Sequence, residues 1–278
     1  MKDAERTLAP FGRRLLTVTA VEQLGAYRIL KATDPDGSAT RAPDPGQFAM
    51  LAAAERWGGG EDDRPYLPRA FSYARWQDGE AHFLLEDVGP GTHRLCELRA
   101  GDGLWALGPL GGGFTLPADD RRALLVGGGV GIAPLAIWQD VLGTQVQVRA
   151  KAMLGFRDRA HADGANLLRE ALVCTDDGSV GPQGFVTELL AAELDRDAHA
   201  TVYACGPPAM LEAVRAVCAR REVPAQLALE AGMACGFGAC FGCVVPKRGG
   251  GYLRVCVDGP VVDAAELESV HAHGGSHA

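Results

Sequence analysis

Residues 123–134 read ALLVGGGVGIAP, an apolar run that leads into four glycines and then a proline. The run shows no alternation of apolar and polar residues, which predicts a strand buried on both faces. Glycines directly after a strand, with a proline early in the next segment, predict a tight turn into a helix. A buried strand that turns straight into a helix is typical of a parallel α/β sheet.

Two kinds of pattern lie on either side of this stretch. From its first strand onward, expected strands alternate with expected helices, which predicts a parallel sheet. The further expected strands are 148–156, 171–178 and 200–207, and the expected helices are 132–142, 166–172, 185–194 and 209–222. Upstream, short strand-like runs are separated by Asp, Gly and Pro clusters, which predicts an antiparallel barrel. These runs are 15–24, 27–33, 47–53, 69–75, 81–88 and 103–109.

Composition limits the classes of function. The chain has 278 residues, enough for two or three domains of roughly 100–150 residues each. A formal net charge of −8 argues against nucleic acid or an anionic membrane surface as partner, because both need a basic patch. We see neither an apolar run of about 18 residues nor a signal-peptide pattern at the start. Four of the eight cysteines fall within residues 235–256, which favours one local site in a reducing cytoplasm over disulfides.

Those four cysteines carry the most specific signal in the chain. Cys235, Cys240, Cys243 and Cys256 follow the spacing C-x4-C-x2-C-x12-C, and the first three match the plant-type run of [2Fe–2S] ferredoxins. Glycines between them allow the chain to wrap tightly and bring backbone N–H groups toward the sulfurs. The segment therefore predicts an iron–sulfur cluster.

A structural zinc site, or a group of buried thiols, is the alternative for these cysteines. Zinc sites usually pair two short Cys-x2-Cys turns across a longer gap. Here three cysteines fall close together and are interleaved with glycine, so the spacing favours the cluster.

Two short segments of the expected barrel suit a phosphate group. In RAFS (69–72) the arginine lies on a strand, and its guanidinium fits two oxygens of a pyrophosphate, although a strand arginine is more often a surface residue. GPGT (89–92) precedes a helix-like segment and offers backbone donors and a hydroxyl to an anion. A plain turn with an N-cap is the alternative interpretation of the second segment.

The glycine-rich turn of residues 126–134 is a candidate nucleotide site. It gives Gly129-x-Gly131-x-x-Pro134 instead of the full Rossmann fingerprint, and no acidic residue follows at the expected interval. The strand–turn–helix context favours a bound phosphate, and the alternative is a turn that needs glycine for packing. CGPP (205–208) ends a later strand, so we expect Cys205 near the same crevice, unless it is a buried core thiol.

Set in chain order, these segments resemble the ferredoxin–NADP reductase superfamily. The resemblance rests on RAFS, GPGT, GPLG (108–111), GGGVGIAP and YACGPPAML (203–211). A cysteine segment placed after the nucleotide domain, with CVDGPVV (256–262) at its end, is similar more narrowly to the electron-transfer subunits of NAD-linked dihydroorotate dehydrogenases. The similarity covers roughly residues 14–263.

This resemblance implies a multidomain β and α/β architecture. It implies an FAD-binding β-barrel domain at 10–117, an NAD-binding α/β domain at 118–224, a [2Fe–2S] segment at 225–263 and a disordered tail at 264–278. It implies electron transfer between NAD(H) and a partner, the FMN-bearing catalytic subunit that converts dihydroorotate to orotate in pyrimidine biosynthesis. The assembly would be a heterotetramer in the cytoplasm.

The resemblance also implies the roles of individual residues. Arg69 would hold the FAD pyrophosphate, Phe71 would lie against the isoalloxazine, and Ser72 would lie near flavin N5. The full set expected to bind FAD is Arg69, Ala70, Phe71, Ser72, Leu84, Leu85, Glu86, Gly91 and Thr92. The set expected to bind the nicotinamide nucleotide is Gly128, Gly129, Gly131, Cys205, Gly206 and Pro207. The four cysteines would bind the cluster, and no catalytic base or nucleophile is expected in this chain.

Some positions depart from the family or leave its function open. Ala70 stands where proline is frequent, and Glu86 stands where a basic or neutral residue is usual. Arg157 and Arg159 could meet the 2′-phosphate of NADPH or lie in a solvated loop. His82, His93 and His161 are expected as isolated surface residues.

Two other functions compete with this one. The same module could serve another enzyme, such as a bifurcating NADH–ferredoxin oxidoreductase or a hydrogenase. A zinc-stabilised binding protein without enzymatic activity is the alternative of another class.

Overall fold

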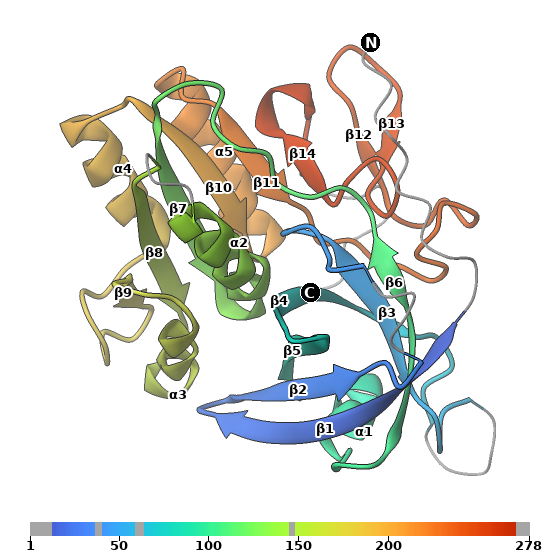
Figure 1. Cartoon of the computed structure of the whole chain (residues 1–278). Coiled ribbons are helices and arrows are strands. Elements are labelled where there is room, and N and C mark those ends of the chain that lie inside the picture. Colours follow the sequence, from blue (N-terminus) through green and yellow to red (C-terminus); the bar gives the residue numbers. More distant parts are fainter. Residues whose placement is uncertain (1–12, 37–40, 59–63, 145–147, 271–278) are drawn as a thin grey trace.

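The computed structural model describes residues 13–36, 41–58, 64–144 and 148–270. A closed barrel and a six-stranded sheet flanked by helices lie side by side, and the C-terminal segment lies over both of them (Figure 1). This arrangement confirms the fold class that the two sequence patterns predict.

The barrel is antiparallel throughout, and short turns join β1 to β2 and β4 to β5, whereas helix α1 lies between β5 and β6. In pairing order its strands are β1 (Arg14–Leu24), β2 (Tyr27–Thr33), β5 (Glu80–Glu86), β4 (Arg69–Gln77), β3 (Phe48–Ala53) and β6 (Gly103–Leu110). Leu30, Leu51, Phe83 and Leu104 are fully buried in one apolar cluster, which holds the barrel together. The short helix α1 (Pro90–Cys96) contacts β3 and β5.

The second sheet is parallel except for its last strand. Its order is β14 (Val261–Asp263), β11 (Ala225–Ala228), β10 (Ala200–Cys205), β7 (Arg122–Gly128), β8 (Ala150–Phe156) and β9 (Leu172–Thr175). The other elements of this region are η1 (Gly129–Gly131), α2 (Ile132–Thr144), α3 (Arg159–Ala162), η2 (Asp163–Leu167), α4 (Val186–Arg196) and α5 (Pro208–Arg220). None of the described helices is long and apolar enough to cross a membrane.

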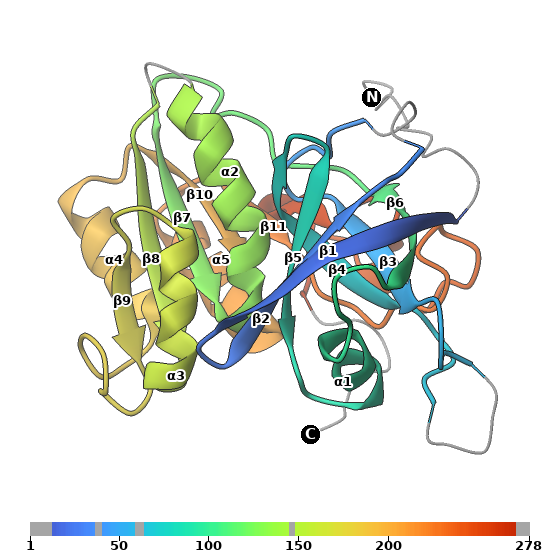
Figure 2. The same cartoon turned by 60° about the horizontal axis from the view of Figure 1, so that its bottom comes forward.

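Helix α2 joins the sheet to the barrel. Residues 132–139 are all buried, as expected for a helix with apolar side chains on every face. One apolar cluster contains Leu135 of α2, Leu125 of the sheet, and Tyr27 and Leu84 of the barrel. Figure 2 shows α2 between the sheet and the β2–β5–β4 side of the barrel. The barrel and the sheet therefore share part of their apolar core.

The β1–β2 hairpin makes a second contact between the two units. Its turn residue Gly25 has a φ of 57°. A Cβ at this position would lie 2.1 Å from the backbone oxygen of Ala160 in α3, so only glycine allows the approach. The adjacent Ala26 N–H donates a hydrogen bond to that oxygen at 2.8 Å.

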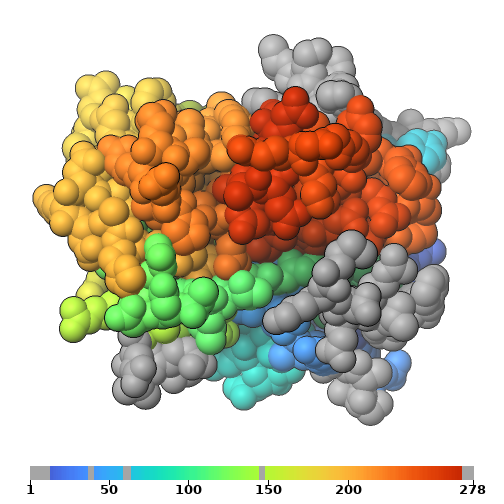
Figure 3. Space-filling model, turned by 90° about the horizontal axis from the view of Figure 1, so that it is seen from above, coloured from blue at the N-terminus to red at the C-terminus, as the bar shows by residue number. Residues whose placement is uncertain are grey.

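The segment after Pro224 is more regular than its glycine-rich sequence indicates. Residues 225–228 form β11, parallel to β10, and β14 returns antiparallel to β11, so this segment completes the sheet. Between them, β12 (Val244–Pro246) and β13 (Tyr252–Arg254) form a hairpin. In Figure 3 the segment (red) forms a continuous face beside the region of α5 (orange).

Two other expectations from the sequence are wrong. Residues 166–172 do not form a helix: η2 ends at Leu167, and Glu170 has a φ of 52°, which no continuing helix permits. The Gln139 side chain bonds both the N–H and the C=O of Arg169 at 2.7 and 2.9 Å, replacing the helical bonds.

The expected disordered tail needs correction at its start. Ala264–Glu266 form η3, and Leu267 and Val270 are 0% and 1% exposed because they pack against the apolar core. Residues 271–278, with their three histidines, lie outside the described residues.

Candidate functional site

The four cysteines expected to bind a cluster meet in the C-terminal segment. Cys235, Cys240 and Cys243 lie on the loop between β11 and β12, and Cys256 follows β13. The Sγ atoms of Cys243 and Cys256 are 3.3 Å apart, and the side chain of Cys240 hydrogen-bonds to Cys235. The sulfurs therefore meet as two pairs. All eight cysteines of the chain are free thiols.

Backbone N–H groups surround the sulfur of Cys235. Burial alone would raise the pKa of this thiol, but hydrogen bonds from the N–H groups of Phe237, Cys240 and Ala239 and from the Cys240 side chain lower it to about 6. A thiolate is the form that binds iron, so the loop is preorganised for a metal. Burial and the neighbouring Cys243 instead raise the pKa of Cys256 to about 12 in the absence of iron.

The cysteine loop rests directly on the barrel. A Cβ on Gly236 would lie 2.5 Å from Cγ of Met50 in β3 and 3.3 Å from Cδ1 of Leu110 in β6. Cys243 and Cys256 belong to the same apolar cluster as these two barrel residues. In β3, Met50 pairs with Ala70 of β4, so a single residue separates the loop from the RAFS segment.

One edge of the cysteine loop faces solvent. Cys240 is exposed, whereas Cys243 and Cys256 are each 2% exposed. The rings of Phe237 and Phe241 beside it are 55% and 60% exposed, and the guanidinium of Arg254 lies 5.6 Å from the Phe241 ring. Exposed aromatic rings therefore flank the one exposed cysteine of the loop.

Arg69 and Gly91 lie against each other, as a pyrophosphate site requires. Arg69 begins β4 and donates a hydrogen bond to the C=O of Leu67 at 2.6 Å. A Cβ on Gly91 would lie 2.6 Å from Nε of Arg69, so glycine lets the guanidinium cover the first turn of α1. The arginine charge thus lies against the glycine turn, which fits a bound phosphate.

The other FAD candidates divide into accessible and buried residues. Ala70 is exposed, and Phe71 and Ser72 are half-buried. Leu84 and Leu85 are 2% and 0% exposed, because they fill the core on the two sides of β5.

The hydroxyl of Thr92 is used inside its own turn. It accepts hydrogen bonds from the N–H groups of Val88 and Gly89 at 2.9 and 3.0 Å and donates one to the Gly89 C=O at 3.0 Å. The Thr92 hydroxyl therefore caps its own turn, as the alternative interpretation of this segment expected.

A cavity of about 530 Å³ opens at the carboxyl ends of the parallel strands, where ligands of such sheets bind. Its lining comes from the sheet and from the barrel. It includes Tyr27, Glu86, Gly128, Gly129, Phe156, Arg157, His161, Asp176, Phe185, Pro207 and Met210. The sequence predicted Gly128, Gly129, Pro207 and, as an FAD residue, Glu86.

Tyr27, in the wall of the cavity, has a buried polar group without a partner. The residue is 0% exposed, and its hydroxyl has no hydrogen-bond partner among the described residues. Burial, and next the charge of Glu86, raise the pKa of the phenol, so it remains a donor. A buried hydroxyl without a partner is costly, and a polar ligand atom would satisfy it. No sequence motif marks this residue.

The glycines of the expected nucleotide turn have different tasks. Gly129 has a φ of 54° and open space on its Cβ side, whereas a Cβ on Gly131 would lie 2.5 Å from the backbone of Gly206. Gly131 and Gly206 therefore allow two loops to touch. Cys205 is 3% exposed and does not line the cavity, and burial raises the pKa of its thiol.

The prediction for two histidines is wrong. His161 is part of a network that joins the barrel to α3: its ring nitrogens lie 2.6 Å from Asp158 and 3.2 Å from Glu86. His82 is also largely buried and bonds Glu80 at 2.8 Å. His93 is exposed, as expected, and its hydrogen bond to the Asp87 carboxylate raises its pKa.

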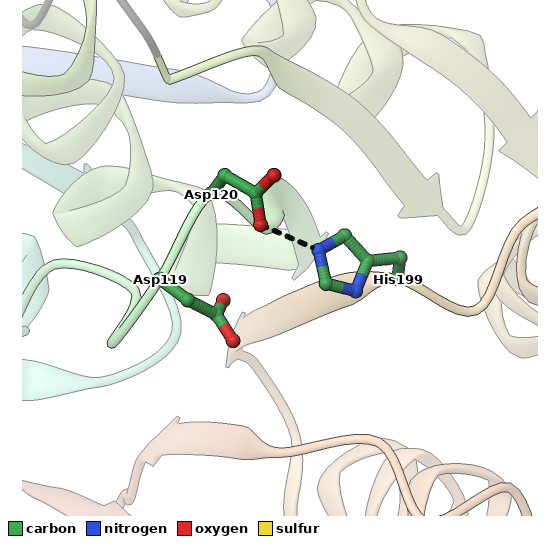
Figure 4. A group of neighbouring side chains, drawn as sticks. All are labelled: Asp119, Asp120 and His199. Atoms are coloured by element: carbon green, nitrogen blue, oxygen red, sulfur yellow. Dashed lines mark hydrogen bonds and ion pairs between the residues drawn. The ribbon is translucent and has the colours of Figure 1, made fainter.

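A second group of possible metal ligands lies at the opposite end of the sheet. Asp119, Asp120 and His199 precede β7 and β10, and their ligand atoms lie within 4.8 Å of one another (Figure 4). All three are exposed, and His199 already bonds Asp120 at 2.8 Å. Arg121 hydrogen-bonds to Asp119 at 3.0 Å and lowers the pKa of that carboxyl. These residues lie at the amino ends of β7 and β10, whereas the cavity lies at the carboxyl ends, and we assign them no role.

Comparisons with known proteins agree with this arrangement. A family model described as the iron-sulfur cluster binding domain of dihydroorotate dehydrogenase B matches residues 230–268. The dihydroorotate dehydrogenase B (NAD(+)) electron transfer subunit of Geobacillus kaustophilus is 37% identical over 264 residues, which cover 92% of this chain and 98% of that protein. The subunit of the same name from Caldanaerobacter subterraneus is 37% identical over 237 residues, covering 82% and 88%.

Solved structures show the same architecture. An NADH-dependent reduced ferredoxin-NADP oxidoreductase, solved in work on flavin-based electron bifurcation, has a TM-score of 0.77 and 26% identity, covering 94% of this chain and 92% of that one. The cytochrome P450 reductase GcoB of Amycolatopsis has a TM-score of 0.62 and 26% identity, covering 80% and 69%.

Proposed function

The chain belongs to the family of dihydroorotate dehydrogenase B electron transfer subunits, and from this membership we propose the route that its electrons take. It is an oxidoreductase subunit of the NAD-dependent enzyme and carries an iron–sulfur binding domain. The proposed route runs between NAD(H) in the cavity and a [2Fe–2S] cluster on the four cysteines, through FAD on the barrel. Beyond the cluster lies the FMN-bearing catalytic subunit.

One observation carries this proposal: the cysteine loop lies on Met50 of β3, and Met50 pairs with Ala70 of β4. A flavin held by residues 69–72 would therefore lie on the strand next to the cysteine loop. Electron transfer between protein cofactors needs a short path, and this proximity of the two proposed sites supports the route.

The FAD site rests on Arg69 and Gly91. Their close approach presents a guanidinium beside the glycine turn, where it would bind and orient a pyrophosphate. Phe71 and Ser72 follow on the same strand, and their half-buried side chains are available to the ring system. When bound, a flavin exchanges electrons both in pairs and singly, which allows a nicotinamide to supply a one-electron centre.

The nicotinamide nucleotide is assigned to the cavity. Gly129 leaves open space for a phosphate beside the start of α2, and Tyr27 offers the hydroxyl that has no partner. The lining of the cavity does not include Gly131, Cys205 or Gly206. These residues lie where the two loops beside the cavity touch each other, so their proposed role is to hold the loops in place.

The paired sulfurs support two irons. In a tetrahedral zinc site with Zn–S distances of about 2.3 Å, all four sulfurs lie about equally far apart. Here Cys235 associates with Cys240, and Cys243 with Cys256, so each pair can bind one iron.

We assign the catalytic partner to the face around Cys240. Exposed phenylalanine rings flank this cysteine, and apolar residues of this kind are enriched at protein interfaces. A heterotetramer with two copies of each subunit is the expected assembly, and eight free thiols suit the cytoplasm. Residues 10–117, 118–224 and 225–263 are proposed as the FAD, NAD and cluster units, although β11 and β14 complete the nucleotide-domain sheet.

The experiment is reconstitution with the catalytic subunit, using Cys240→Ser and the buried Cys218→Ser as its control. Purified wild-type protein should show flavin and cluster absorbance, and NADH should reduce the partner's FMN. Cys240→Ser should lose the cluster bands and the reduction of FMN, whereas Cys218→Ser should retain both. Normal FMN reduction by a Cys240→Ser protein that lacks the cluster would refute the route.

A further inference from the structure

Strand β3 of the barrel is buried on both of its faces. The side chains of a barrel strand alternate between inside and outside, and here all six residues are buried. Ala49 and Leu51 belong to the apolar cluster inside the barrel. Phe48 and Met50 belong instead to the cluster that contains the two buried cysteines of the loop. The C-terminal segment therefore covers the outer face of β3.

This cover ends at the next strand, β4. Residues directly opposite each other in an antiparallel pair have their side chains on the same face. Met50 lies opposite Ala70, and Phe48 lies opposite Ser72, so all four share the outer face. Ala70 is nevertheless exposed and Ser72 is half-buried. The part of β4 where FAD is proposed to bind is thus open, directly beside the covered strand.

Met50 lies beneath the start of the cysteine loop. Gly236 directly follows Cys235 and has a φ of 80°. A Cβ on Gly236 would lie 2.5 Å from Cγ and 2.9 Å from Sδ of Met50, and Met50 itself is 2% exposed. The loop therefore has an exposed edge at Cys240 and a closely packed apolar floor at Met50.

The hydrogen bonds to the sulfur of Cys235 do not come from this floor. Their backbone donors are Phe237, Ala239 and Cys240, which all belong to the loop itself. A substitution of Met50 therefore leaves these donors in place and changes the polarity and the access of water beneath the loop. Hydrogen bonds to sulfur and exposure to solvent both tune the reduction potential of a cluster, and here the second can be varied without the first.

We propose that Met50 is a positioning residue that keeps the reduction potential of the cluster low, an inference that rests on the proposed cluster function of the four cysteines. Reduction adds a negative charge to the cluster, which water or a polar side chain would stabilise. A closely packed thioether excludes both from the floor of the loop. The side of the cluster toward the flavin strand is then less polar than the side at Cys240.

The test is a redox titration of the cluster in the full chain, followed by electron paramagnetic resonance, with two variants of similar volume. Met50→Leu keeps the floor apolar and should retain the wild-type potential. Met50→Gln places an amide beneath the loop and should shift the potential to more positive values. Met50→Gln should also lose iron to a chelator about tenfold faster, as expected for a residue beside the metal ligands. A role in packing alone would not move the potential.

Phe48→Leu is the matched control. Phe48 lies two residues from Met50 on the same face of β3 and is equally buried, at 2% exposure. Its ring approaches Gly111, outside the cysteine loop, since a Cβ on that glycine would lie 3.2 Å from Cε1 of Phe48. Phe48→Leu should lower the thermal stability and keep the wild-type potential. Met50→Ala, which leaves space for water, replaces Met50→Gln if the buried amide prevents folding, and it should shift the potential in the same direction.

The results that would overturn this inference differ from those that would refute the proposed function. If Met50→Gln binds the cluster with the wild-type potential, or if Phe48→Leu shifts the potential equally, Met50 does not set it, whereas the cysteines still bind the cluster. If the reconstituted wild-type chain contains no iron and gives no cluster signal, the proposed function fails together with the inference.

Discussion

The cysteine loop and the nucleotide cavity differ in how far apart along the chain their residues lie. The proposed cluster ligands fall within residues 235–256, and backbone N–H groups of the same loop surround the sulfur of Cys235. The cavity takes its lining from places between Tyr27 and Ala213, in the barrel and in the sheet. A local loop can preorganise a metal site by spacing alone, whereas the cavity exists only when two units are packed together.

The largest effect should come from removing a buried cluster ligand. Cys256→Ala should abolish nearly all bound iron, because one iron loses a thiolate that no nearby group replaces. Iron content and visible absorbance measure this loss. Cys174→Ala, at a thiol that is also buried but lies in the sheet, is the control and should keep its iron. Nucleotide binding should be nearly unchanged in both variants, and its loss in Cys256→Ala would show that the two regions are not independent.

Two substitutions in the glycine turn test how much the close packing of its loop against Gly206 contributes to stability. Gly131→Ala places a Cβ 2.5 Å from the Gly206 backbone, so we expect it to lower the free energy of unfolding by about 3 kcal/mol. Gly129→Ala meets open space and incurs only the cost of a positive φ, about 1 kcal/mol. Denaturant unfolding of both variants measures the difference. Equal losses would mean that the loop contact does not control the site.

The parallel sheet and helix α4 share an acid-sensitive contact, which provides a test of the sheet that does not involve the cysteine loop. Lys151 and Arg122, on β8 and β7, hold the pKa of Glu193 in α4 below its usual range by hydrogen bonds. This stabilisation is present above the unfolded pKa of about 4.3 and disappears as the pH falls through the lower folded pKa.

Glu193→Gln should therefore cost about 2 kcal/mol at pH 7 and progressively less as the pH falls below about 4. Unfolding followed by intrinsic fluorescence across this range measures the cost. Glu188→Gln, on an exposed face of the same helix, is the control and should change stability little. A cost in Glu193→Gln that stays constant with pH would assign the effect to packing instead of charge.

The smallest expected effect is a change in NADH affinity when Tyr27, which the barrel contributes to the cavity, loses its hydroxyl. Tyr27→Phe removes a hydroxyl that has no described partner, so the free protein should be as stable as wild type or slightly more stable. If that hydroxyl meets the nucleotide, NADH should bind about fivefold more weakly, roughly 1 kcal/mol. Tyr73→Phe, inside the barrel and away from the cavity, controls for loss of a buried phenol. Unchanged NADH affinity in Tyr27→Phe would remove Tyr27 from the site.

Two short sequence patterns predicted parts of the candidate sites, but neither predicted the contacts around them. The cysteine spacing identified the cluster segment, and the strand–glycine–helix pattern located the cavity beside Gly129. That pattern could not show that Gly131 touches Gly206, because the contact depends on two loops about 75 positions apart in the chain, a separation at which only tertiary packing decides proximity. His161 looked isolated for the same reason, since its partner Glu86 lies in another unit.

Strand and helix assignments failed where a tertiary contact replaced a local one. Residues 166–172 have a helical composition, but Gln139 of α2 bonds the backbone of Arg169 and removes the need for helical hydrogen bonds. Residues 225–228 are too few to give a strand pattern in the sequence, yet they form a strand because they pair with the edge of β10.

The amino-acid sequence by itself determined the barrel, the parallel sheet and the iron–sulfur segment, because period, turn residues and cysteine spacing act over a few positions. Only the tertiary structure decided which residues line the cavity, that the Tyr27 hydroxyl is buried without a described partner, and how the cysteine loop lies on Met50. The physical reason is that burial, charge compensation and unsatisfied hydrogen bonds are properties of surroundings, and here those surroundings come from distant parts of the chain.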